Sequence, residues 1–265
     1  MMPLDIMDAD VLHVSVSQLK TWLRCPRQYE LKYVRGHEPE AVPHALAFGS
    51  AFHAALAAHY GERQAGRALS LDALVSAFAR AWDEQGQRGV PIEAGEGVPD
   101  AVDLAQRMLA AFLDHDAAAP AEVVAVEKPV SAVLHDPDTG VVLEERLTGF
   151  IDLVVREDGR LVVVENKTAA RRYAEDQLRF DVQPTAYQLA LRQAGAGDEV
   201  GLRYQIVTKA KAPAVQVEDV MRDDQDQEDF LRMAVGVLRA IDAGVSYPLR
   251  RWQCRSCPYR RRCVK

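Results

Sequence analysis

The sequence predicts an α/β protein in which a central mixed β-sheet is flanked by helices and preceded by an N-terminal helical part. Two observations support this fold class. Apolar side chains recur at helical spacing through residues 17–117, whereas residues 121–168 are rich in β-branched residues with the shorter period of strands. Helices and strands then follow one another to residue 243, so the order indicates α/β or α+β around one sheet.

The N-terminal part is expected to contain four helices. Ser17 can cap the first, which runs to Cys25, because a serine hydroxyl accepts a hydrogen bond from a free N–H of the first turn. Large apolar side chains at helical spacing predict a second helix over residues 45–60. Two further helices are expected at residues 70–86 and 99–117, divided by a Gly- and Pro-containing loop over residues 86–99.

Three successive strands are expected next, joined as a meander. They span residues 121–134, 141–155 and 160–168. The Asp158-Gly159 pair between the last two is typical of a two-residue hairpin turn, since both positions need positive φ. The remaining chain predicts a helix at 184–194, strands at 201–208 and 212–219, and a closing helix at 223–243.

The hairpin turn determines which charged residues lie opposite one another. We expect Glu157 and Arg160 to flank the turn. In that register Asp152 faces Glu165, and Lys167 lies on the same face as Glu165. The opposite face is expected to be apolar, with Ile151, Leu153, Val155, Val162 and Val164. The sheet is therefore buried on both sides, and the three charged groups do not simply face solvent.

The facing carboxylates of Asp152 and Glu165 need a compensating positive charge, because like charges opposite one another destabilise a strand pair and burial adds to the penalty. Lys167 can neutralise one carboxylate. A divalent cation held by both carboxylates neutralises the pair and uses the oxygen ligands that Mg²⁺ prefers. The alternative is a structural Glu165–Lys167 ion pair with Asp152 at the sheet rim. Buried ion pairs contribute little stability, so the pattern favours a metal site.

The composition is that of a globular protein of one or two domains, with 265 residues, a net charge of −7 and 48% hydrophobic residues. The first residues lack the basic and apolar regions of a signal peptide, and no run approaches the roughly 20 apolar residues that cross a bilayer. We therefore expect a cytoplasmic protein with no membrane partner. The C-terminal stretch is locally basic and is expected either to contact phosphates or to form a solvated tail; it contains Arg250, Arg251, Arg255, Arg260, Arg261, Arg262 and Lys265.

The charged hairpin resembles the core of the PD-(D/E)XK nuclease superfamily. Asp152 on one strand and Glu165-Asn166-Lys167 on the next match its motif. The resemblance implies a restriction-endonuclease-like core with Asp152, Glu165 and Lys167 as catalytic residues. Glu127 lies on the preceding strand, where related enzymes often have an acidic residue, so it is a further candidate for the site.

Two flanking motifs are similar to the RecB-like branch of that superfamily. Gly49 and His53 match its G-x-x-x-H helix, which implies that His53 joins Asp152 and Glu165 as a metal ligand. Gln183 and Tyr187 match its Q-x-x-x-Y motif, which implies contact with a DNA strand near the metal. Pro184 suits the first turn of a helix, so we expect Gln183 at the start of its helix.

The four cysteines follow a one-plus-three pattern. Cys25 lies near the N-terminus, and Cys254, Cys257 and Cys263 form C-x2-C-x5-C near the C-terminus. This arrangement resembles a subgroup that includes the CRISPR-associated RecB-like nuclease and the AddB nuclease domain, and it implies a 4Fe-4S cluster. Four thiolates equally suit structural zinc, which we favour less. Either metal would link the two ends of the chain beside the sheet. It would stabilise the fold, because closing a very long loop lowers the conformational entropy of the unfolded chain.

The resemblance implies a Mg²⁺- or Mn²⁺-dependent deoxyribonuclease with a single domain over residues 1–265. Residues 54–120 would be a helical insertion and residues 249–265 the cysteine segment. The implied reaction is exonuclease cleavage of single-stranded DNA or DNA ends in repair, recombination or related processing. The implied DNA contacts are Gln183, Tyr187, Arg260 and Arg261.

The sequence contains no G-x-x-x-x-G-K-[ST] phosphate-binding loop, so the chain has no motor of its own and a helicase or recombination partner is expected. The alternative to a nuclease is a non-catalytic DNA-binding subunit of such a complex. The presence of Asp152, Glu165, Lys167 and His53 together argues against that alternative, because a site without activity has no chemical need for all four.

Overall fold

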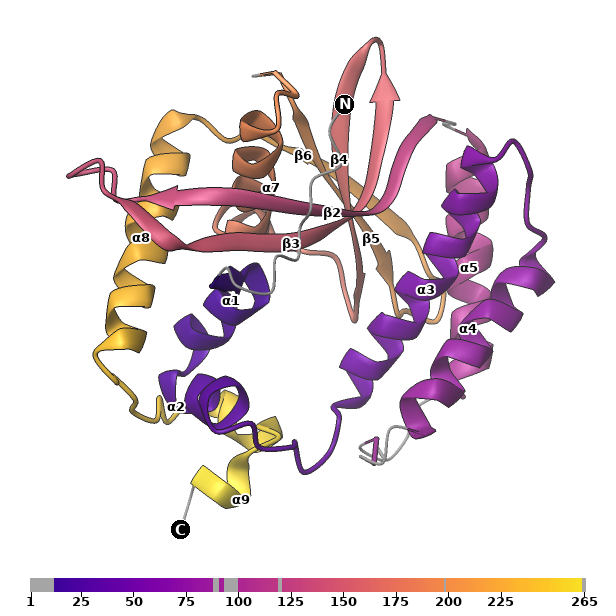
Figure 1. Cartoon of the computed structure of the whole chain (residues 1–265). Helices are drawn as coiled ribbons and strands as arrows, with labels where there is room; N and C mark the ends of the chain where they lie inside the picture. The colour runs from indigo at the N-terminus through magenta and orange to yellow at the C-terminus, as the bar shows by residue number, and fades with distance from the viewer. Residues whose placement is uncertain (1–11, 88–90, 93–99, 119–120, 198, 264–265) are drawn as a thin grey trace.

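The computed structural model describes residues 12–87, 91–92, 100–118, 121–197 and 199–263. Within these residues a mixed six-stranded sheet has helices on both faces (Figure 1), which confirms the predicted fold class. The loop expected at residues 86–99 lies mostly outside the described residues. No helix in the described part of the chain is long and apolar enough to cross a membrane.

The sheet contains parallel and antiparallel neighbours. Its strands are β1 (His13–Ser15), β2 (Glu122–His135), β3 (Val142–Glu157), β4 (Arg160–Ala169), β5 (Gly201–Thr208) and β6 (Val215–Val220). Their order is β1-β3-β4-β5-β6, and β2 also pairs with β3. The β2-β3-β4 meander is antiparallel as predicted, whereas β1–β3 and β4–β5 are parallel. Asp158 and Gly159 have φ values of 49° and 79°, which confirms the predicted hairpin turn.

The helices agree with the predicted segments to within a few residues at most ends. The N-terminal elements are α1 (Val16–Arg24), α2 (Pro26–Tyr29), a π-helical turn (Glu30–Val34), α3 (His44–Gln64), α4 (Leu71–Gln87) and α5 (Ala101–Ala118). The later elements are α6 (Glu175–Arg179), α7 (Val182–Gln193), α8 (Asp224–Asp242), a 3-10 turn (Trp252–Ser256) and α9 (Arg260–Cys263). Whether residues 54–120 form an insertion in a nuclease core stays a prediction.

Each face of the sheet has its own hydrophobic core. On one face, α3, α4 and α5 bury aromatic side chains such as Phe48, Phe78 and Phe112. On the other face, α1, α7 and α8 bury side chains such as Leu19 and Phe230. Figure 1 shows these two groups of helices on opposite sides of the strands. A central sheet covered on both faces explains why its strands are apolar almost throughout.

Ile151 lies on a different face from the predicted one. Leu153, Val155, Val162 and Val164 share the core of α3–α5, but Ile151 packs in the core of α1, α7 and α8. The pleat of β3 is interrupted beside Glu127 of β2, which has a φ of 45° and is skipped in the β2–β3 pairing. The prediction assumed strict alternation and was wrong at this position.

The start of α1 also differs from the prediction. Ser15, not Ser17, is the N-cap: its hydroxyl accepts a hydrogen bond from the N–H of Gln18, and the Gln18 side chain accepts one from the N–H of Ser15. This reciprocal pair satisfies two free donors of the first turn, which Ser17 cannot do from inside the helix. Strand β1 was not predicted, because three residues carry too little periodicity and β1 exists only through its pairing with β3.

Gly149 of β3 allows close contact between the sheet and α7. A Cβ atom at Gly149 would lie 2.9 Å from Cε1 of the buried Tyr187 ring, whose hydroxyl is held by the Phe150 carbonyl. We therefore expect Gly149→Ala to lower the free energy of unfolding by about 1–3 kcal/mol, because the ring cannot move away without losing that bond. Urea unfolding followed by circular dichroism measures the change.

The control is Gly236→Ala in α8, where an added Cβ meets no atom within 4 Å. This change should raise the free energy of unfolding by about 0.5–1 kcal/mol, since alanine favours a helix over glycine. A Gly149→Ala protein as stable as the wild type would contradict the close packing of Tyr187 on β3.

Candidate active site

The site lies where β3 and β4 separate. Their pairing runs from Glu157–Arg160 to Leu153–Val164, which confirms the predicted register over those pairs. Beyond this point β4 has β5 as its one strand partner among the described residues. The Asn166 N–H, one residue beyond Glu165, donates to Asp152 Oδ2 at 2.8 Å. The Asp152 carboxylate therefore takes the place of a backbone acceptor at the open end of the hairpin.

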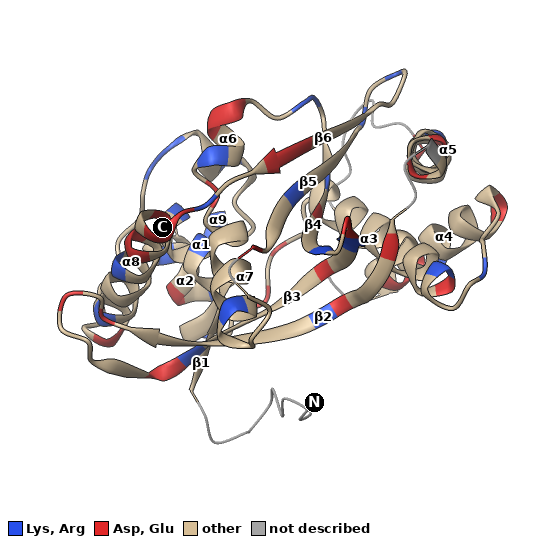
Figure 2. Ribbon diagram, turned by 90° about the horizontal axis from the view of Figure 1, so that it is seen from above, with Lys and Arg blue, Asp and Glu red and all other residues tan. Residues whose placement is uncertain are grey.

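Asp152 belongs to a cluster of three groups able to hold a cation. One ligand atom from each of His53, Glu127 and Asp152 lies within 4.8 Å of the other two. His53 Nδ1 is 3.4 Å from Asp152 Oδ1. Figure 2 shows charged segments of both signs where β2, β3, β4 and α3 come together. The structure thus brings together the predicted ligands His53 and Asp152 with the further candidate Glu127, whereas the third predicted ligand, Glu165, is not one of these three residues.

The protonation of this cluster reflects its crowding. Burial and the negative charge of Asp152 both raise the pKa of the Glu127 carboxyl. Burial alone would lower the pKa of His53, but the Asp152 carboxylate outweighs it, and the pKa of His53 is raised. Each of the Glu127 and Asp152 carboxylates disfavours the ionisation of the other. A bound cation would relieve this repulsion, and the His53 imidazole lies beside them as a further ligand.

Glu165 and Lys167 form the second part of the site. The Lys167 ammonium donates to Glu165 Oε1, so both side chains lie on the same face of β4, as predicted. Glu165 is only 3% exposed, and its Oε2 has no hydrogen-bond partner among the described residues. Burial raises the pKa of Glu165 to about 7, and the charge of Asp152 acts in the same direction. Burial alone would lower the pKa of Lys167, but the Glu165 carboxylate outweighs burial, and the pKa of Lys167 is raised.

Gln183 and Tyr187 connect α7 to this pair. Gln183 is the second residue of α7, so its expected place at the helix start is confirmed. Its Nε2 donates to Glu165 Oε1 at 2.8 Å and to the Tyr187 hydroxyl at 3.0 Å, and its Oε1 accepts from Lys167 at 3.3 Å. The Tyr187 hydroxyl donates to the Phe150 carbonyl at 2.7 Å. The structure therefore places the motif residues in contact with the hairpin, although their contact with DNA stays a prediction.

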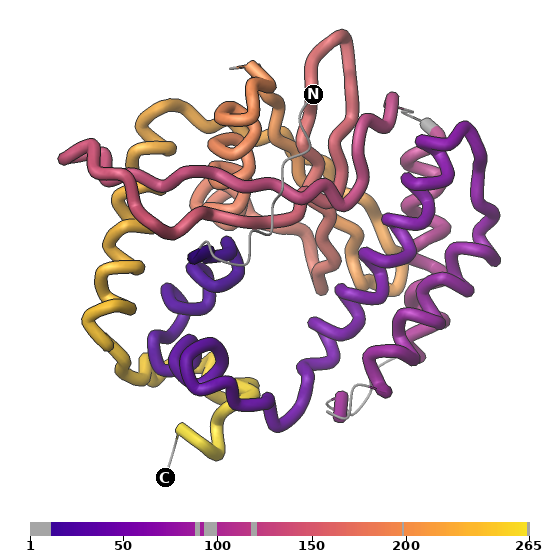
Figure 3. The backbone as a smooth tube through the Cα atoms, in the orientation of Figure 1, coloured from indigo at the N-terminus to yellow at the C-terminus, as the bar shows by residue number. Residues whose placement is uncertain are grey.

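The four cysteines are brought together from the two ends of the chain. All four are free thiols, and burial together with the charges of Cys25, Cys254 and Cys263 raises the pKa of Cys257. The N–H of Leu249 contacts Cys25 Sγ at 3.5 Å, and the Cys254 thiol contacts the Leu249 carbonyl at 3.6 Å. Figure 3 shows the C-terminal segment beside the first helices. The expected proximity of Cys25 to the C-terminal cysteines is therefore observed.

The basic C-terminal residues lie outside the hairpin site. Arg260 and Arg261 are exposed on α9, and Arg261 is 3.6 Å from Glu40, an ion pair that anchors this segment to the chain after α2. Their predicted contact with DNA is not tested by the structure.

Sequence reasoning missed Lys20 and Asp181. Their 2.8 Å ion pair joins residues 161 positions apart, and no local pattern marks it.

The chain belongs to the PD-(D/E)XK nuclease superfamily, which its sequence matches over residues 13–264. The structure is similar to that of a protein from Eubacterium rectale named "Putative exonuclease", with a TM-score of 0.57, 15% identity, and coverage of 100% of this chain and 95% of that chain. At this identity the likeness shows a shared fold. The structure of SSO0001 has a TM-score of 0.38 at 15% identity, over 90% of this chain and 94% of that one, which is too low to support an argument. No curated protein matches the sequence.

The pKa of Glu165 predicts how stability depends on pH. Its pKa is raised from 4.5 to about 7 in the folded protein, so the folded state binds the Glu165 proton more tightly than the unfolded chain does. This contribution to the free energy of unfolding is fully present below pH 4.5, falls as pH rises, and is lost above pH 7. In Glu165→Gln it is absent at every pH.

With EDTA present, the free energy of unfolding of the wild type minus that of Glu165→Gln should therefore decrease from pH 4.5 to pH 7 and then level off. Urea titrations at several pH values measure this difference. A difference that is constant or that rises with pH would contradict a buried, protonatable Glu165.

Proposed function

We propose that this nuclease-superfamily chain is a Mg²⁺- or Mn²⁺-dependent deoxyribonuclease that hydrolyses phosphodiester bonds. The observation that carries the proposal is the convergence of His53, Glu127 and Asp152 within 4.8 Å, beside the Glu165–Lys167 pair, at the point where β3 and β4 separate. Membership of the PD-(D/E)XK superfamily supports the same activity.

The residues present fit a divalent cation. Carboxylate oxygens and one imidazole nitrogen suit Mg²⁺ or Mn²⁺, and the buried Glu165 Oε2 is left without a hydrogen-bond partner among the described residues. We assign Asp152, Glu165 and His53 as the ligands, with Glu127 as an additional one. A bound cation would supply Lewis-acid stabilisation of the phosphate and lower the pKa of a water molecule.

The neighbouring side chains have roles suited to their contacts. Lys167 is 23% exposed, so its ammonium can orient the attacking water or neutralise charge that develops on the phosphate. Gln183 holds the Glu165 carboxylate in place and, with Tyr187, fixes the edge of β3 through Phe150. Contact of Gln183 and Tyr187 with a DNA strand beside the cation is a further part of the proposal.

The proposed substrate is single-stranded DNA or a DNA end, cut as an exonuclease in repair, recombination or related processing. The exposed Arg260 and Arg261 would contact phosphates, held near the first helices by the cysteine segment. A helicase or recombination partner would supply translocation.

We propose that Cys25, Cys254, Cys257 and Cys263 hold a 4Fe-4S cluster. The donor set suits this role, because four thiolates are the usual ligands of such a cluster, and Cys25 and Cys254 from the two ends of the chain both contact Leu249. Zinc is the alternative for the same ligands.

The central test is cleavage of end-labelled single-stranded DNA with Mg²⁺ or Mn²⁺. We expect EDTA to abolish cleavage, and Asp152→Ala and Lys167→Ala each to slow it by at least about a hundredfold, because each removes a charge that stabilises the transition state. Asp83→Asn, a change at an exposed carboxylate on α4, is the control and should cleave at the wild-type rate. Variants at Asp152 and Lys167 that cleave normally would refute the proposed site.

The same assay separates the proposed nuclease from a non-catalytic DNA-binding subunit. A wild-type protein that binds labelled single-stranded DNA in a gel-shift assay, yet leaves it uncut with either cation, would support the subunit instead.

Metal analysis tests the cysteine site. Protein purified without oxygen should contain about four irons and four acid-labile sulfides per chain. Cys263→Ala should lose this iron and melt at a lower temperature, since the link between the chain ends is broken. Lys167→Ala is the matched control, because it should keep the iron while losing cleavage. One zinc per chain without sulfide would overturn the iron–sulfur assignment.

A further inference from the structure

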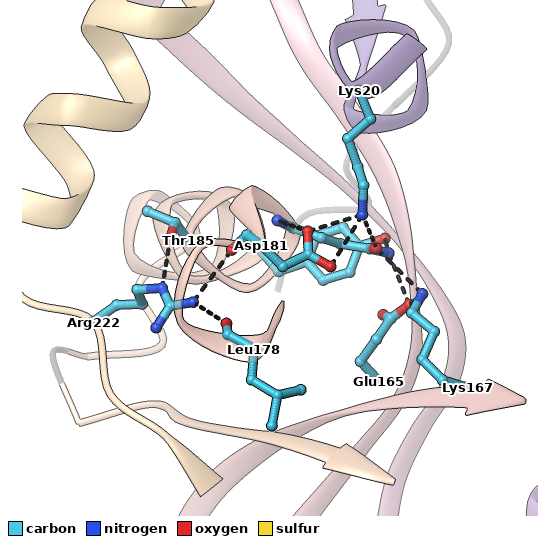
Figure 4. A network of polar contacts seen from close by, with 9 residues as sticks. Lys20, Glu165, Lys167, Leu178, Asp181, Thr185 and Arg222 are labelled. Carbon is cyan, nitrogen blue, oxygen red and sulfur yellow. Dashed lines mark hydrogen bonds and ion pairs between the residues drawn. The ribbon is translucent and has the colours of Figure 1, made fainter. Parts of the chain in front are cut away.

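Lys20 of α1 reaches the start of α7 beside the proposed active site. Figure 4 shows its side chain extending from α1 toward Asp181 and the Glu165–Lys167 pair. Its ammonium lies 2.8 and 3.0 Å from the two Asp181 carboxylate oxygens and 3.5 Å from Gln183 Oε1. The ammonium is thus bonded mainly to the Asp181 carboxylate, and its contact with Gln183 is the longest of the three.

Asp181 is the residue through which Lys20 acts on α7. It is the N-cap of this helix, and its side chain accepts a hydrogen bond from the Gln183 N–H at 3.1 Å. The Asp181 side chain is only 14% exposed, and the charge of Lys20 lowers its pKa even though burial opposes this. The ion pair therefore keeps a buried cap ionised and fixes the position of Gln183.

Arg222 holds the same turn from the other side. Its guanidinium donates to the Leu178 carbonyl at 2.7 Å, to the Asp181 carbonyl at 3.2 Å and to the Thr185 hydroxyl at 3.1 Å. Figure 4 shows these contacts between Arg222 and the turn, and none of the three is to the Gln183 side chain. Only the lysine side of the turn can thus act directly on that amide.

The charges around Gln183 determine the orientation of its amide. Oε1 faces two ammonium groups, Lys20 at 3.5 Å and Lys167 at 3.3 Å, while Nε2 donates to Glu165 at 2.8 Å. A rotated amide would place its NH₂ against two cations and its oxygen against a carboxylate. Removal of Lys20 weakens this preference and loosens the support of Glu165.

We propose that Lys20 is a positioning residue for the nuclease reaction, acting through Asp181 and Gln183 on the Glu165–Lys167 pair; this rests on the proposed function. The Lys20 ammonium is directed at Asp181 and Gln183, while its side chain is 37% exposed, so kinetics separate a positioning lysine from one that binds substrate. Loss of Lys20 should lower kcat and leave KM nearly unchanged. A lysine that binds a DNA phosphate would instead raise KM.

The test compares four single variants and one double variant in the single-stranded DNA cleavage assay. Lys20→Met removes the charge, Lys20→Arg keeps it, and Asp181→Asn keeps a capping oxygen while removing the carboxylate charge. Arg239→Met is the matched control: it removes a helix cation that pairs with the buried Asp136 near the β2–β3 turn, away from the site. Melting temperatures establish that each variant is folded.

We expect Lys20→Met to lower kcat at least about tenfold with KM changed by less than about twofold, because small misplacements of reacting groups slow the chemical step. Lys20→Arg should keep most of the wild-type kcat, and Arg239→Met should keep all of it. The double variant Lys20→Met/Asp181→Asn should be about as slow as Lys20→Met alone, since both changes break one interaction.

Nuclear magnetic resonance of glutamine side-chain amides provides a readout that does not depend on cleavage. The Gln183 Nε2 signals, assigned by their disappearance in Gln183→Glu, should shift in Lys20→Met and stay unchanged in Arg239→Met. The role of Lys20 would be overturned if Lys20→Met left the Gln183 signals unshifted, left kcat unchanged or raised KM. An equal loss of kcat in Arg239→Met would overturn it as well. A wild-type protein that cuts no DNA would refute the proposed function. The amide signals alone would then show whether Lys20 positions the Gln183 side chain.

Discussion

The separation of β3 from β4 beyond the Leu153–Val164 pair is the constraint on which the site depends. Where the ladder ends, the Asn166 N–H needs another acceptor, and the Asp152 carboxylate supplies it at 2.8 Å. The same contact holds Asp152 at the open end of the hairpin. His53 reaches this point from α3 and Glu127 from an interrupted part of β2, so two local breaks in strand pairing bring Glu127 and Asp152 together with His53.

The charged groups of Asp152, Glu165 and Lys167 are unfavourable for folding, but their arrangement suits the binding of a cation and a substrate. Glu165 is almost fully buried with one oxygen unpaired in the described structure, and its pKa rises to about 7. Lys167 offsets only part of the negative charge of Asp152 and Glu165. Structural ion pairs are usually better satisfied than this, whereas sites that bind cations and substrate retain unpaired groups. The geometry therefore favours a functional site over the structural ion pair that the sequence left open.

Helix α1 connects this site with the cysteine segment. Lys20 lies in the middle of the helix and contacts the first turn of α7, and Cys25 follows the last residue of the helix. The C-terminal segment is bonded to the chain that follows α1: the Arg27 N–H donates to the Tyr247 carbonyl, and the Glu40 N–H donates to the Pro258 carbonyl. Segments near both ends of the described chain thus pack against one another beside the first helices (Figure 3).

The sequence by itself determined the elements and much of the site. Apolar periodicity located the main helices and strands, and the Asp158-Gly159 turn fixed the register up to Leu153–Val164, because both signals are local. Tertiary structure decided the face of Ile151, the approach of the candidate Glu127, rather than Glu165, to His53 and Asp152, and the contact of Lys20 with Asp181. These features depend on where β3 leaves β4 and on how α1, α3 and α7 pack against the sheet. Such contacts join residues far apart in the chain, so no local pattern of side chains encodes them.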